Sequence, residues 1–192
     1  MEDFGQRARL VVSKYVRALS LDGMVFSQDL SISAKDYGGL YTRGSTIHFD
    51  PVFLDGLQDK TLAFFLAHEL GHGWFGSAYE GILRERLIHA KNTEGRNLTE
   101  AEMSEEESLL QGMEETYADA FAIRKLFESG WRQEEVAECL SDCRSHLQAY
   151  FARHGQGLEH SGLLADWLVV TMETRRRLWR DFAEGLGFTF SP

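Results

Sequence analysis

Apolar and polar positions in the first 51 residues follow a helical pattern and then a β pattern. The apolar spacing predicts a helix over about 3–20, with Asp3 as its N-cap. Residues 21–36 mix short apolar alternation with polar breaks, and Leu30, Ile32 and their polar neighbours predict a strand there. Two further strands are expected at 40–42 and 46–49, around a turn at Arg43-Gly44. This part of the chain therefore predicts a small β-sheet behind an N-terminal helix.

From Asp59 onward the apolar positions recur at helical spacing. One stripe of apolar side chains lies four residues apart and should face the core: Leu62, Leu66, Leu70 and Trp74. Residues 81–90 fit a further helix, and the polar stretch Lys91–Asn97 fits a loop. The polar insertion at about 76–104 is long enough to cover a cleft as a lid, although no pattern in it requires that role.

Two capping signatures stand at the start of the next helix. Thr99 is followed by Glu102, and Ser104 is followed by Glu107. We expect the helix at about 104–129, with its end at Gly130. Helices at about 133–152 and 162–184 follow. The prediction is one domain, residues 1–192, of the α+β class, mostly helical with a small N-terminal sheet.

Composition and charge exclude several classes of protein. The formal net charge is −10, which argues against a general nucleic-acid binder because phosphate contacts need lysine and arginine. No apolar run is long enough to span a membrane, and the acidic start of the chain lacks the features of a signal peptide. Cys139 and Cys143 are expected to be reduced, which favours the cytoplasm; export without a cleaved signal stays open.

The sequence His68-Glu69-Leu70-Gly71-His72 carries the chemistry. Four residues turn a helix by about 400°, so the two imidazoles emerge on nearly one face and can bind one metal ion. The glutamate between them lies beside that ion, where it can take a proton from an activated water. The alternative is two histidines that merely face solvent, and the apolar residues before the motif argue against it.

A catalytic zinc needs a third protein ligand, and the sequence offers one downstream. Glu115 and Asp119 lie four apart on one helix face. Glu115 could complete the zinc ligands, and Asp119 could accept the N–H of a ligating histidine and fix its tautomer. Glu114 is a weaker choice because its neighbour at i+4 is Ala118. The alternative is that these acids only solvate a helix face.

His68–His72 followed by Glu115-x-x-Ala118-Asp119 resembles the gluzincin metallopeptidases, a group that includes thermolysin. The second motif is similar to that of the CAAX-prenyl-protease and heat-shock membrane-protease family, and to that of the ImmA/IrrE-type regulator peptidases. The resemblance covers about 38–130. It implies a zincin-like fold, zinc, peptide-bond hydrolysis and a peptide substrate paired with an edge strand, for which chain order suggests Thr46–Phe49.

The chain departs from those families in three respects. It has no membrane-spanning segments, it has 42 residues between His72 and Glu115, and it lacks an H-P-x-x-x-R segment near its end. His160 lies where that segment would fall and is the first candidate for the catalytic oxyanion donor; His154 and Tyr117 are the others. The simpler interpretation of His160 is a surface histidine.

Cys139, Cys143 and His146 share one predicted helix face, which makes a second metal site conceivable. Ordinary buried cysteines are the simpler interpretation.

Together the motifs predict a zinc-dependent hydrolase, a metalloprotease of narrow specificity that acts on protein or peptide substrates. Zinc would be held by His68, His72 and Glu115. Glu69 would be the catalytic base, and Asp119 would accept a hydrogen bond from a ligating histidine. Three alternatives stay open: a regulatory protein with a zincin fold, an injected effector that cleaves one partner, and a pseudo-enzyme with a structural zinc. No pattern in the sequence specifies an oligomeric state.

Overall fold

The computed structural model describes residues 3–28, 39–73 and 95–153, with the side chains of residues 105–116 and 151 left out of the description. The elements are α1 (Phe4–Tyr15), β1 (Val25–Gln28), β2 (Leu40–Arg43), β3 (Thr46–Phe49), α2 (Pro51–Leu54), α4 (Glu100–Glu128) and α5 (Gln133–Arg153). A further helix covers residues 59–73; we call it the motif helix because it carries His68 to His72. The predicted α+β class with a small sheet near the N-terminus is confirmed.

The sheet has three described strands in the order β1-β3-β2. β1 and β3 are parallel, whereas β2 and β3 form an antiparallel hairpin. The hairpin turns at Gly44, whose φ of 60° precedes a residue with negative φ, the pattern of a type II′ turn. β3 therefore has a neighbour on both sides. The prediction that Thr46–Phe49 is an edge strand is wrong, because chain order does not determine strand order.

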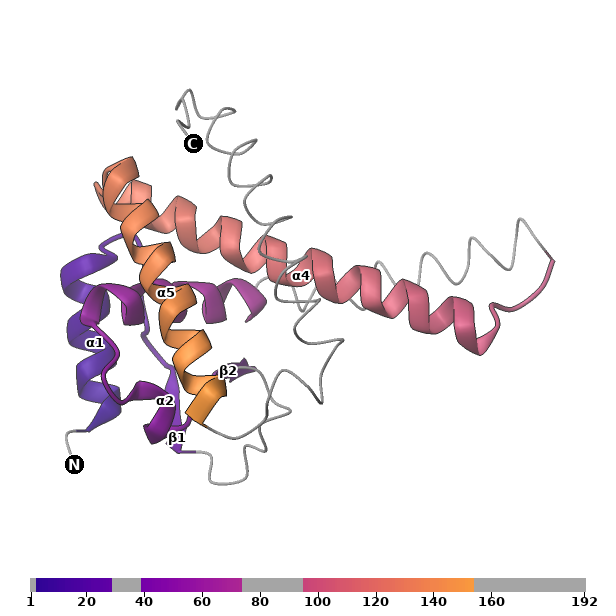
Figure 1. Ribbon diagram of the computed structural model, residues 1–192, viewed down its shortest axis with the longest axis horizontal. Helices are drawn as coiled ribbons and strands as arrows, with labels where there is room; N and C mark the ends of the chain where they lie inside the picture. The colour runs from indigo at the N-terminus through magenta and orange to yellow at the C-terminus, as the bar shows by residue number, and fades with distance from the viewer. Residues whose placement is uncertain (1–2, 29–38, 74–94, 154–192) are drawn as a thin grey trace.

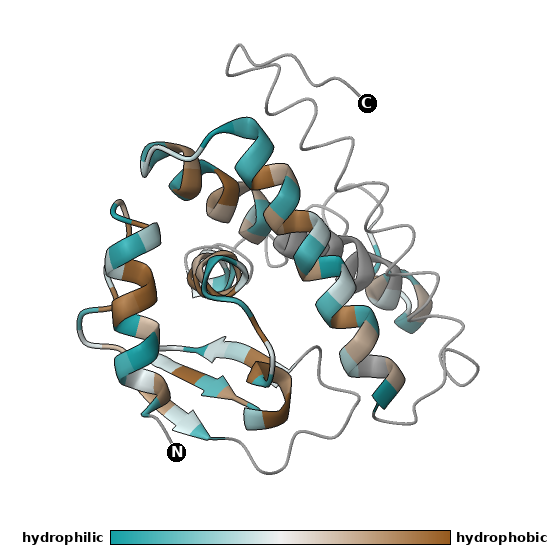
Figure 2. Ribbon diagram, turned by 60° about the vertical axis from the view of Figure 1, so that its left-hand side comes forward, coloured by the Kyte–Doolittle hydropathy of each residue, from teal (hydrophilic) through white to brown (hydrophobic). Residues whose placement is uncertain are grey.

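The motif helix is the centre of the fold. Every residue from 61 to 69 is buried, as expected of a helix that is covered on all sides. In Figure 2 this helix is seen nearly end-on, between α1 and α5 and over one face of the sheet. Leu62 and Leu66 of the predicted core stripe are fully buried and Leu70 is partly buried, while Trp74 lies outside the described residues.

Both ends of α1 are explained by local interactions. The Asp3 carboxylate accepts a hydrogen bond from Gly5 N at 3.0 Å, so the predicted N-cap is correct. The helix ends at Tyr15, about five residues earlier than expected. Val16 leaves the helical conformation and is fully buried. The apolar pattern continues past Tyr15 because the following residues also contribute to the core.

α4 begins at the first of the two capping signatures. The Thr99 side chain accepts from Glu102 N, and Glu102 accepts from Thr99 N, which completes a capping box. Arg96 makes a forked ion pair with the same carboxylate, and together these contacts hold the pKa of Glu102 well below its usual range. Ser104 therefore lies inside the helix. The predicted start at 104 is wrong, and residues 100–104 belong to α4 rather than to a loop (Figure 1).

Other expected segments have different outcomes. The helix predicted at about 133–152 is confirmed as α5, and the strands at 40–42 and 46–49 are confirmed as β2 and β3. The possible lid and the helices at 81–90 and 162–184 lie wholly or largely outside the described residues. Within the described ranges, no helix combines the length and hydrophobicity that a membrane span requires.

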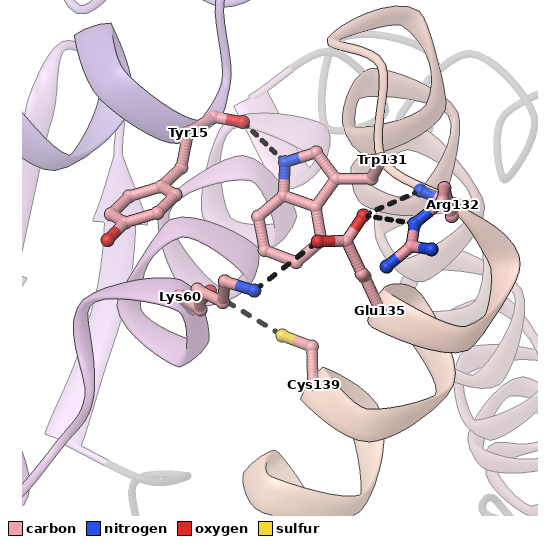
Figure 3. A network of polar contacts seen from close by, with 6 residues as sticks. All are labelled: Tyr15, Lys60, Trp131, Arg132, Glu135 and Cys139. Carbon is pink, nitrogen blue, oxygen red and sulfur yellow. Dashed lines mark hydrogen bonds and ion pairs between the residues drawn. The ribbon is translucent and has the colours of Figure 1, made fainter.

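A polar network joins the motif helix to the elements around it (Figure 3). Trp131, in the turn between α4 and α5, donates its indole N–H to the Tyr15 carbonyl at 2.6 Å. Lys60 forms an ion pair with Glu135 at 3.5 Å and lies over the Trp131 ring. Cys139 of α5 donates to the Lys60 carbonyl oxygen. These contacts fix the first turn of the motif helix against α1 and α5.

We predict that Trp131→Phe lowers the free energy of unfolding by about 1–3 kcal/mol, because the Tyr15 carbonyl loses its indole donor. Arg132→Ala is the control from the same network: its ion pair with Glu135 is exposed, so a loss below about 0.5 kcal/mol is expected. Urea denaturation of both variants measures the difference. Equal losses would show that the indole hydrogen bond contributes no special stability.

Candidate metal centre

The last turns of the motif helix bring three potential metal-binding side chains together. His68, Glu69 and His72 each offer a ligand atom, and these atoms lie within 4.8 Å of one another. His68 and Glu69 are buried, at 8% and 6% exposure, while His72 is more accessible. The helical spacing of the motif thus produces the convergence that the sequence predicts. The site has a buried inner side and a more open side at His72.

The two imidazoles converge through equivalent nitrogens. The Nε2 atoms of His68 and His72 are 3.0 Å apart, and the rings meet edge to face. Two nitrogens bound to one tetrahedral zinc at its usual bond length would be about 3.3 Å apart. The separation in the structure is close to that value. The pair can therefore hold a metal ion with little rearrangement.

Asp119 fixes one of the two rings from behind. Its Oδ1 lies 2.8 Å from His68 Nδ1, and Asp119 is 1% exposed. A carboxylate in this position accepts a hydrogen bond from Nδ1–H, which keeps the proton on Nδ1 and leaves the Nε2 lone pair for a metal ion. The predicted role of Asp119 behind a histidine therefore has a direct geometric basis. The ring also lies near Phe64, with centroids 6.1 Å apart, which limits water access from that side.

Small side chains allow α4 to approach the motif helix at this point. Ala118 and Ala122 of α4 are fully buried, and Ala118 is the residue before Asp119. Opposite them lies Gly71, where a Cβ atom would meet the Ala118 Cα atom at 2.7 Å. The two backbones are thus in contact one turn beyond His68. Both residues lie inside the two sequence motifs, but their part in bringing the helices together is visible only in the structure.

The third predicted ligand, Glu115, stands one turn before Asp119 in a continuous stretch of α4. Its side chain and that of Glu114 are outside the described residues, so the choice between them stays a prediction. His160 and His154 also lie outside the described residues. Tyr117 is 40% exposed and stands about 160° around the helix axis from Asp119. It faces away from His68, which argues against Tyr117 as an oxyanion donor.

The cysteine pair on α5 does not behave as a metal site. Cys139 and Cys143 are free and buried, as the simpler interpretation predicted. Burial, and then the neighbouring Cys139 thiol and the Asp119 charge, raise the pKa of Cys143, and Cys139 donates a hydrogen bond to the Lys60 carbonyl oxygen. His146 directs its Nε2 at the Phe53 carbonyl oxygen. The three residues are therefore engaged in packing and hydrogen bonding.

Comparisons of the chain with protein-family models, with curated proteins and with solved structures give no significant match. The assignment of a function therefore depends on the motifs and on the geometry of the site.

We predict that Asp119→Ala weakens zinc affinity by roughly 10–100-fold, because His68 loses the carboxylate that fixes its tautomer. Metal-competition titration with a chromogenic chelator measures the dissociation constant. The loss should be smaller than that for Glu115→Ala, which would remove a ligand. Unchanged affinity in Asp119→Ala would show that the hydrogen bond has no influence on metal binding.

Proposed function

We propose that this protein is a zinc-dependent peptidase. The observation that carries the proposal is the hydrogen bond between His68 Nδ1 and the buried Asp119, combined with the 3.0 Å approach of the two Nε2 atoms. Two histidines that only faced solvent would need neither feature. The resemblance of the two motifs to gluzincin peptidases supports zinc as the metal and a peptide bond as the target.

The donor set fits zinc. Two neutral imidazoles and one carboxylate are a common ligand set of catalytic zinc sites, which keep one position open. His68 and His72 would supply the imidazoles, and the motif similarity assigns the carboxylate to Glu115. When bound, zinc would polarise the scissile carbonyl and lower the pKa of a water molecule. Residues that hold a purely structural zinc would have no use for the glutamate at position 69.

Glu69 is proposed as the general base. Its carboxylate is buried beside the two histidines, within 4.8 Å of their ligand atoms, on the same helix. It would take a proton from the attacking water onto a carboxylate oxygen and then deliver that proton to the leaving amine. Asp119 would keep His68 in the correct tautomer throughout. An oxyanion donor would be a separate group, with His160 as the candidate from the sequence.

The substrate would be a protein or peptide segment in extended conformation. Pairing with a sheet edge is the mode that the motif similarity implies. Because β3 is central, that segment would pair instead with β1 or β2, the outer strands among the residues that the structure describes. We propose narrow specificity, since a promiscuous peptidase would endanger the cell that makes it.

We predict one zinc ion per chain. The two Nε2 atoms already stand at a separation that suits one ion, and the carboxylate from α4 would complete the protein ligands. Purification without added metal followed by elemental analysis tests this, with His68→Ala and His72→Ala as controls that should lose the ion. A metal-free protein that also fails to take up added zinc would exclude the proposed function.

We predict that Glu69→Gln abolishes hydrolysis and keeps zinc. The amide is nearly isosteric with the carboxylate and cannot accept the proton. Zinc-loaded wild type and Glu69→Gln are each incubated with a cell lysate, and new termini are identified by mass spectrometry. Termini at a few sites should appear with wild type alone. If none appears although zinc is bound, a regulatory role without catalysis becomes the better explanation; termini at many unrelated sites would contradict narrow specificity.

A further inference from the structure

The motif helix and α4 approach each other closely at Gly71. A Cβ atom there would lie 2.7 Å from Ala118 Cα, 3.1 Å from Ala118 O and 3.2 Å from Ala118 Cβ. The first two atoms are backbone, so no side-chain rotation could relieve the contact. Among the described residues, none comes within 4 Å of the virtual Cβ of Gly73, two residues further along the same helix. The close approach is therefore specific to position 71.

The contact lies next to the polar pair that prepares the metal site. Gly71 follows His68 by three residues, almost one helical turn, and Ala118 directly precedes Asp119. The 2.8 Å hydrogen bond from His68 Nδ1 to Asp119 Oδ1 thus connects the same two helices within one turn of the glycine. A change in the distance between the helices at Gly71 would reach that hydrogen bond directly.

Glycine at position 71 lowers the stability of the helix, and its backbone conformation does not require it. Glycine in a helix interior is less favourable than alanine by about 1 kcal/mol, and Gly71 has ordinary helical dihedral angles rather than the positive φ that requires glycine. Its backbone conformation would accept alanine. Within the described part of the chain, it is the proximity of Ala118 that excludes a side chain.

We propose that Gly71 is a positioning residue whose missing side chain sets the helix separation at which Asp119 can orient His68. A methyl group at position 71 would require the helices to separate by about 0.7 Å to bring the 2.7 Å approach to ordinary contact distance. A movement of that size along the line of the His68–Asp119 hydrogen bond would stretch it from 2.8 Å to about 3.5 Å, past the usual range of N–H···O distances. The consequence for zinc rests on the proposed function, whereas the effect on the hydrogen bond does not.

The first test uses metal-free protein and does not depend on the proposed function. In ¹⁵N-histidine-labelled wild type, the Nδ1 proton of His68 should be visible by NMR and protected from solvent exchange, and Asp119→Ala should lose this signal. Gly71→Ala should lose or weaken it in the same way. Gly73→Ala, the matched control, should retain it. An unchanged signal in Gly71→Ala would overturn the proposal.

The second test is a double-mutant cycle on zinc affinity. Gly71→Ala alone should weaken zinc binding by roughly 10–100-fold, as the loss of a hydrogen-bond partner of a metal ligand usually does. When added to Asp119→Ala, it should change affinity by less than about 3-fold, since the hydrogen bond is already absent. Full additivity of the two losses would show that Gly71 affects zinc binding by a route other than the His68–Asp119 hydrogen bond, which would overturn the proposal. If wild type binds no zinc, the proposed function fails, and the NMR test still decides the role of Gly71.

Thermal unfolding of each variant controls for misfolding. If Gly71→Ala does not fold, Ala118→Ser offers a smaller intrusion into the same contact from α4. It should shift the His68 signal and the zinc affinity in the same direction by smaller amounts. A folded Ala118→Ser with wild-type values for both would contradict the proposal.

Discussion

Burial of the central part of the motif helix, residues 61–69, is the constraint on which the rest of the structure depends. A helix that is covered on all sides must find partners for any polar side chain it carries, because an unsatisfied buried polar group costs several kcal/mol. Residues 62–67 of the helix avoid this cost because all six are apolar. The last turns carry His68 and Glu69, which are as buried as the apolar residues before them. α4 supplies the partner that His68 needs in Asp119, and so its position and its sequence are tied to the motif.

The same constraint accounts for the small residues where the helices meet. A charged residue on α4 can hydrogen-bond to a buried histidine only if the two backbones come close. Gly71 and Ala118 permit that approach, and Ala122 continues the small-residue surface one turn later. At the other end of the motif helix, larger side chains fix its position instead, through the contacts of Lys60 with α5 and with Trp131. The helix is thus held at its start by polar contacts, and at the end that carries His68 and His72 by backbone proximity.

The correct and incorrect sequence predictions have different physical origins. Local rules located β2, β3 and α5 well, because hairpin turns and helical periodicity depend on neighbouring residues. The end of α1 was misplaced because the buried Val16 continues the apolar pattern after the helix has stopped. The start of α4 was misplaced because two capping signatures compete there, and the additional ion pair from Arg96 to Glu102 accompanies the first. The edge strand was misplaced because strand order is not a local property.

The sequence by itself determined the composition of the candidate centre. The spacing of His68, Glu69 and His72 places all three on adjacent faces of one helix, wherever that helix lies. Asp119 was proposed from its spacing to Glu115, but only the tertiary structure decided that it meets His68, because 51 residues separate the two in the chain. The role of Gly71 and the central position of β3 also emerged only in three dimensions. The role of a glycine inside a helix and the position of a strand inside a sheet both depend on contacts with residues that are distant in sequence.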